Sequence, residues 1–113
     1  EISIADSTDV AELRDGEIHR YSIRPEDFGL SRAPLDAIRV NDPAESLLML
    51  RAVLAGEPGP ARDIVQLNAG AAIYAAGCAE TLAAGVARAG EVLASGEAAR
   101  RLDQVVTLTA DFA

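Results

Sequence analysis

The chain has 113 residues, half of them hydrophobic, and a formal net charge of -8. This length suits a single domain with a modest core. The negative charge argues against nucleic acid or an anionic membrane as a partner, because both attract clustered Lys and Arg. No run of about 18 uncharged apolar residues occurs, so we expect no membrane-spanning segment. The single cysteine suits a reducing cytoplasm.

Residues 1–25 predict a β-hairpin. Asp15 and Gly16 lie between two alternating segments, and both residue types tolerate the positive φ of a type I′ turn. With a two-residue loop, the expected cross-strand partners are Leu13 and Ile18, Glu12 and His19, and Val10 and Tyr21. We expect Glu12 and His19 on the solvated face.

Residues 26–41 predict an irregular connector. Phe28 and Leu30 are its apolar residues, and we expect them to pin it to a core. The stretch 34–40 has room for one or two helical turns.

Residues 42–113 predict three or four helices. Asp42 is a good N-cap, Pro43 suits the first helical position, and Glu45 completes an Asp version of the capping box. Gly56 and Pro58 end this first helix.

The second predicted helix begins at Pro60 and ends at Gly77. From Ala69 to Ala76 only Tyr74 carries a polar side-chain atom. A helix that is apolar all round is typical of a buried one, so we expect other elements against several of its faces.

A third predicted helix is capped by Thr81 and breaks at Ser95 and Gly96 before a last helical stretch. Its expected core side is Leu82, Val86, Ala89 and Leu93, and the last stretch carries Leu102, Val105 and Leu108. With so few aromatic residues, the core must come from closely approaching helices. The pattern is α+β by itself, or the end of a larger α/β domain.

Few residues carry chemistry. His19 is predicted to form a plain cross-strand pair, Cys78 to be a small buried residue, and Asn68 to bond a backbone group in the core. The Gly- and Pro-rich stretch 56–61 lacks both the Walker and the dinucleotide motif, so we expect an ordinary helix connection there.

The order of four blocks resembles the C-terminal third of the anthranilate phosphoribosyltransferase family. These blocks are Asp27-Phe28-Gly29-Leu30, Asp42-Pro43-Ala44-Glu45, Gly59-Pro60-Ala61-Arg62-Asp63 and Leu67-Asn68-Ala69. The resemblance implies an α/β fold of the nucleoside phosphorylase and phosphoribosyltransferase type, here a hairpin followed by three to four helices. Residues 1–113 would be an incomplete domain, and the start at Glu1 suggests a piece of a longer protein.

The resemblance also implies a function. The family transfers phosphoribosyl from phosphoribosyl pyrophosphate to anthranilate in tryptophan biosynthesis, uses Mg²⁺, and works as a homodimer. Its Gly-rich loop and anthranilate-contacting residues would lie before Glu1, so we expect no catalytic or cofactor-binding residue here. Glu1 matches the second acid of a metal-binding Asp-Glu pair, which makes it the one expected metal ligand.

Two other classes of function stay open. One is a related pyrimidine nucleoside phosphorylase, although the 25–30 and 41–45 blocks favour the first family. The other is a non-catalytic binding module on the same fold, against which the net charge of -8 argues.

Overall fold

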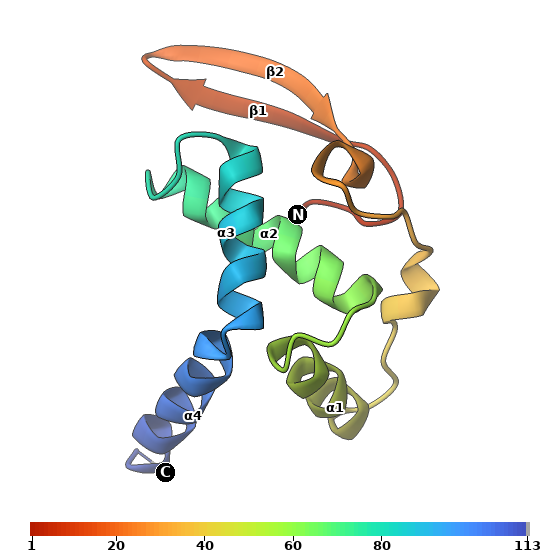
Figure 1. The fold of residues 1–113 in the computed structure, drawn as a ribbon, viewed down its shortest axis with the longest axis vertical. Helices are drawn as coiled ribbons and strands as arrows, with labels where there is room; N and C mark the ends of the chain where they lie inside the picture. The colour runs from red at the N-terminus through yellow and green to blue at the C-terminus, as the bar shows by residue number, and fades with distance from the viewer. Residues whose placement is uncertain (113) are drawn as a thin grey trace.

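The computed structural model describes residues 1–112, in which a β-hairpin is followed by four helices (Figure 1). The elements are β1 (Thr8–Arg14), β2 (Glu17–Ile23), the 3₁₀ turns η1 (Pro25–Phe28) and η2 (Leu35–Ile38), α1 (Pro43–Leu54), α2 (Pro60–Ala75), α3 (Leu82–Ala94) and α4 (Glu97–Ala110). No helix within residues 1–112 has the length and apolar character needed to cross a membrane.

The hairpin is confirmed with its predicted register. Asp15 has φ 52° and Gly16 has φ 82°, as a type I′ turn requires. The antiparallel pairs include Glu12 with His19, Leu13 with Ile18 and Val10 with Tyr21.

The expected orientation of the hairpin is wrong. Glu12 and His19 lie on the half-buried face, whereas Leu13 is 74% exposed and Ile18 is 66% exposed. The physical reason is that the inner face meets the hydroxyl of Tyr74 on α2, described below, which donates a hydrogen bond to the Glu12 carboxylate and could make none with a leucine side chain.

The helices α2 and α3 make the most extensive contact between elements, and Figure 1 shows them crossing below the hairpin. Two glycines permit this approach. A Cβ on Gly70 would lie 2.5 Å from the Cα of Val86, and a Cβ on Gly85 would lie 2.3 Å from the backbone oxygen of Gly70. The expectation of closely approaching helices is confirmed.

The core forms where the N-terminal segment meets this crossing. Ile4, Leu67 and Val86 form the buried cluster, and Phe28 and Leu30 pack against it. The predicted pinning of the connector is therefore confirmed, and η2 is the single helical turn within 34–40.

The helix ends follow the predicted signals, with one difference. Asp42 accepts from the N–H of Glu45 at 2.9 Å, as an N-cap does. The Glu45 carboxylate, however, accepts from the N–H and side-chain amide of Asn41, at 2.8 and 2.9 Å, so the expected capping box is wrong in its second half. The Glu45 side chain reaches back to Asn41 instead of Asp42, and Asn41 supplies both hydrogen-bond donors.

Two later helix boundaries are also confirmed. Gly77, with φ 72°, terminates α2. The Thr81 hydroxyl accepts from the N–H of Ala84 at 3.0 Å and begins α3.

The expected burial of α2 on several faces is wrong for this chain. Of the described residues in α2, only Leu67 and Gly70 are buried, and Val65 is 38% exposed. α3 and the N-terminal segment cover one side of α2 and leave the remaining surface partly open. α4 extends away from the other helices (Figure 1), and none of its described residues is buried.

Candidate functional site

A cleft of about 630 Å³ lies between the inner face of the hairpin and the end of α2. Val10, Tyr21 and Ile23 line it from the hairpin, and Ala71 and Tyr74 line it from α2. A second hollow on the same face shares Glu12, Arg14, Tyr21 and Tyr74 with it. The hairpin therefore stands over the helices with open space beneath it.

Glu12 joins the two sides of this cleft. One of its carboxylate oxygens accepts from the hydroxyl of Tyr21 at 3.0 Å, and the other accepts from the hydroxyl of Tyr74. Tyr21 comes from β2 and Tyr74 from α2. Both carboxylate oxygens are thus satisfied by tyrosine donors.

The electrostatics of this cluster favour a charged Glu12 between neutral tyrosines. The hydrogen bond from Tyr74 lowers the pKa of the Glu12 carboxyl against the opposing effect of burial, and Tyr21 and Arg14 lower it further. The hydrogen bond to Glu12 raises the pKa of Tyr74. Burial first, and then the bond to Glu12, raise the pKa of Tyr21. A carboxylate that is ionised and already accepts two hydrogen bonds is suited to holding structure rather than to proton transfer.

The N-terminal segment is held by Asn68 on α2. Its Oδ1 accepts from the N–H of Ile2 at 2.8 Å, and its Nδ2 donates to the backbone oxygens of Ile2 and Ile64, both at 2.9 Å. The predicted backbone role of Asn68 is confirmed. Because these bonds fix the backbone of Ile2, they also limit where the backbone of the neighbouring, exposed Glu1 can lie.

Glu1 is the residue for which metal binding was predicted. A Mg²⁺ site needs several fixed oxygen ligands. Residues 1–112 contain no group of three or more His, Cys, Asp or Glu side chains that could hold a metal ion. The described residues do not fit a complete Mg²⁺ site, and metal binding by Glu1 stays a prediction.

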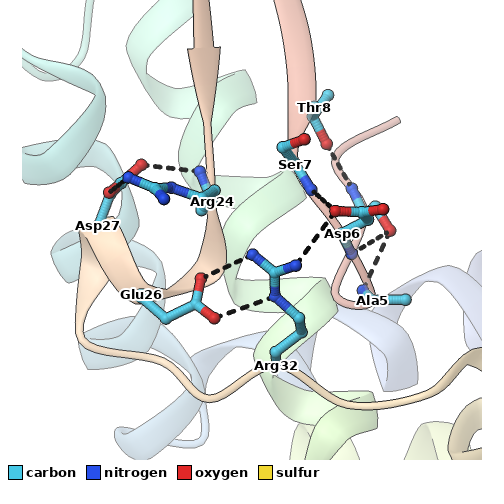
Figure 2. A network of polar contacts seen from close by, with 9 residues as sticks. Ala5, Asp6, Ser7, Thr8, Arg24, Glu26, Asp27 and Arg32 are labelled. Carbon is cyan, nitrogen blue, oxygen red and sulfur yellow. Dashed lines mark hydrogen bonds and ion pairs between the residues drawn. The ribbon is translucent and has the colours of Figure 1, made fainter.

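A second polar network anchors the base of the hairpin (Figure 2). Arg32 contacts Glu26 at 3.0 Å and Asp6 at 3.1 Å, and so ties the segment before β1 to the segment after β2. Ser3 donates its N–H to the hydroxyl of Thr8 at 3.0 Å, and Arg24 donates its N–H to Asp27 at 2.7 Å. The hairpin is therefore fixed where it leaves the helical body.

The other predicted residues have mixed outcomes. His19 lies opposite Glu12 as a cross-strand partner, which is confirmed. The 56–61 stretch is the predicted connection between α1 and α2, with Gly56 at φ 78°. The expected burial of Cys78 is wrong, because this residue is exposed. It follows Gly77 beyond the end of α2, where the chain has left the packed side of the helix.

Sequence reasoning did not find the Glu12, Tyr21 and Tyr74 cluster. A signal for half of it was present. Tyr21 lies two residues from His19, the partner of Glu12, and such diagonal neighbours share one face of a hairpin. The contribution of Tyr74 depends on how the hairpin rests on α2, which no local pattern encodes.

Residues 1–99 match the family model described as glycosyl transferase family, a/b domain. The chain belongs to this family. The match includes the whole hairpin, α1, α2 and α3.

Several curated proteins are similar to this chain. Anthranilate phosphoribosyltransferase from Thioalkalivibrio sulfidiphilus is 58% identical over 110 residues, which cover 97% of this chain and 32% of that protein. The enzymes of the same name from Nitrosospira multiformis and Acidovorax sp. strain JS42 are 54% and 53% identical, over 94% and 100% of the chain. The chain spans about a third of the length of these relatives.

A solved structure has the same fold. The crystal structure of anthranilate phosphoribosyltransferase from Thermus thermophilus matches with a TM-score of 0.85 and 44% identity, over 95% of this chain and 32% of that one. This match confirms the predicted fold class and the resemblance to the C-terminal part of these enzymes.

Proposed function

We propose that this chain forms part of an anthranilate phosphoribosyltransferase, which transfers phosphoribosyl from phosphoribosyl pyrophosphate to anthranilate in tryptophan biosynthesis. The observation that carries the proposal is the identity of 58% to a curated enzyme of that name over 97% of the chain. The relatives described above all have this name, which favours this reaction over nucleoside phosphorolysis.

In that enzyme, this chain contributes structural support for the site and one metal-binding carboxylate, that of Glu1. Asn68 holds the backbone of Ile2, and Glu1 is the neighbouring residue. Glu1 is one oxygen ligand for Mg²⁺ in a site that other residues would complete, since hard cations require several oxygens. The proposal further includes a cytoplasmic homodimer and no nucleic-acid or membrane partner.

A chimera tests this function. Residues 1–113 replace the matching third of the Thioalkalivibrio sulfidiphilus enzyme, and turnover is followed as the loss of anthranilate fluorescence with phosphoribosyl pyrophosphate and Mg²⁺. We expect turnover by the chimera and no turnover by the 113-residue chain alone. A chimera that has the circular dichroism spectrum and sedimentation of the parent enzyme but no activity would refute the proposal.

Glu1→Gln in the chimera tests the metal role. It keeps the size of the side chain but removes its charge, so we expect a higher Mg²⁺ requirement at unchanged melting temperature. Glu17→Gln, at an exposed position of β2, is the matched control. An unchanged Mg²⁺ dependence in Glu1→Gln would contradict the assignment of this residue as a ligand.

A further inference from the structure

Asn68 of α2 is bonded to both backbone groups of Ile2, a residue 66 positions away in the chain. Its Oδ1 accepts from the N–H of Ile2 at 2.8 Å, and its Nδ2 donates to the backbone oxygen of Ile2 at 2.9 Å. One side-chain amide therefore pairs with this residue as a neighbouring β-strand would, through a donor and an acceptor at once. A contact at a single atom would leave the backbone free to pivot, whereas this pair fixes its direction as well as its place.

The Asn68 side chain is itself fixed. Its Nδ2 also donates to the backbone oxygen of Ile64, one turn earlier in α2, at 2.9 Å. The neighbouring residues Leu67 and Gly70 are buried, and Gly70 lies in close contact with the backbone of α3. The amide is thus held by its own helix, and that helix is held by α3.

The N–H of Ile2 belongs to the peptide group that joins Glu1 to Ile2. The atoms of a peptide group lie in one plane, from the Cα of the first residue to the Cα of the second. When Asn68 fixes this N–H, it therefore fixes the plane that contains the Cα of Glu1. On the other side, the backbone oxygen of the fully buried Ile4 accepts from the N–H of Ala33 at 3.0 Å, so the connector also holds the segment. The place of the Glu1 Cα is then set by α2, and only the rotations about the bonds of Glu1 are left.

We propose that Asn68 is a positioning residue for the Glu1 carboxylate. This inference rests on the proposed function, in which Glu1 is one of the oxygen ligands of Mg²⁺. A site for a hard cation needs its oxygens at fixed places, and groups that orient the ligands without touching the metal contribute about 10–100-fold to metal affinity. Asn68 acts on Glu1 through the peptide group of Ile2 and is not a ligand itself.

Asn68→Ala in the chimera removes both bonds to Ile2. We expect this variant to bind Mg²⁺ about tenfold more weakly than the parent chimera. The affinity is measured by calorimetric titration with Mg²⁺ alone, and the Mg²⁺ concentration at half-maximal turnover gives a second reading. Asn68→Gln keeps an amide but displaces it by one methylene, and we expect weaker Mg²⁺ binding there too. Melting curves from far-UV circular dichroism set a temperature at which the variants are folded, and Asn68→Gln decides if Asn68→Ala does not fold.

A double-mutant cycle separates positioning from a general loss of structure. If Asn68 acts through Glu1, Asn68→Ala has little further effect on Mg²⁺ affinity once Glu1→Gln has removed the carboxylate. Gly70→Ala is the matched control, because it disturbs the same helix at its crossing with α3 and not at Ile2. We expect Gly70→Ala to keep the Mg²⁺ affinity of the parent.

The outcomes distinguish this inference from the proposed function. If Glu1→Gln weakens Mg²⁺ binding but Asn68→Ala and Asn68→Gln do not, the positioning role is overturned and the proposed role of Glu1 stands. Equal weakening by Asn68→Ala with and without the Glu1 carboxylate, or similar weakening by Gly70→Ala, also overturns it. If Glu1→Gln leaves Mg²⁺ binding unchanged, the metal role of Glu1 fails and the positioning role fails with it.

Discussion

Replacing Gly70 with alanine places a methyl group where α2 and α3 cross. That carbon would lie 2.5 Å from the Cα of Val86 and 2.6 Å from its backbone nitrogen. Carbon atoms in contact are usually about 3.5–4.0 Å apart, so the helices must separate by about 1 Å. Since both clashing atoms belong to the backbone, no side-chain rotation relieves the overlap.

The cost can be estimated from this geometry. Overpacking of a well-packed core costs about 3 kcal/mol at the upper end of its usual range. Alanine returns about 1 kcal/mol through its better helix propensity. The net loss of unfolding free energy is then about 2 kcal/mol, which lowers the melting temperature of a chain of this size by about 10 °C. Thermal unfolding followed by far-UV circular dichroism measures it.

Gly90→Ala is the matched control on the same helix pair. Its added carbon would lie 2.6 Å from Nε2 of Gln66, which is the end of a flexible side chain. Gln66 can move away and lose its bond to the backbone oxygen of Val86 at 3.1 Å. That loss of about 1 kcal/mol is offset by the gain in helix propensity, so we expect little change. A Gly70→Ala variant that melts no lower than Gly90→Ala would refute the close-crossing argument.

Three further predictions concern single polar groups. Asn68→Asp removes both bonds that the side-chain amide donates and places a carboxylate against the backbone oxygen of Ile2. We expect the unfolding free energy to fall by about 2–4 kcal/mol and the N-terminal segment to be cleaved faster by a protease. Equal cleavage rates for the parent and the variant would contradict this. Thr81→Ala removes the N-cap of α3 and should cost about 1 kcal/mol in urea unfolding, whereas an unchanged midpoint would argue against the cap. The Arg32 hydrogen bond lowers the pKa of Glu26 from its ordinary value of 4.5. This ion pair therefore stabilises the fold fully above that pH, and the stabilisation disappears as the pH falls through the lowered pKa. Arg32→Met should therefore flatten the dependence of the unfolding free energy on pH in this acidic range. If the unfolding free energies of the parent and of Arg32→Met change in parallel with pH, the stabilising role of this ion pair is disproved.

Local signals account for the elements that were predicted correctly. Asp15 and Gly16 define a turn whose two-residue loop sets the whole hairpin register, because each pair follows from the one before. Asp42 and Thr81 cap helices through bonds only three residues long. Such features depend on neighbours in the sequence, which is why the sequence was enough to predict them.

The candidate site was predicted less well, for reasons that concern packing. Strand alternation shows that Glu12, His19 and Tyr21 share a face, but both faces of this hairpin mix polar and apolar residues. The pattern alone does not decide which face rests on α2. Cys78 has a similar explanation, since its exposure depends on what lies beside the end of α2 and not on the residue type.

The amino-acid sequence by itself determined the hairpin and its register and predicted three or four helices with most of their ends, and the order of four sequence blocks carried the family resemblance. The hairpin and the helix ends depend on turn chemistry, capping and periodicity, which act over a few residues. Only the tertiary structure decided that Gly70 and Gly85 bring α2 and α3 into backbone contact, that Asn68 holds Ile2, and that Tyr74 reaches Glu12. Asn68 and Tyr74 lie 66 and 62 residues from these partners. Contacts over such separations arise from the way the packed elements meet in space, and no local pattern specifies that meeting.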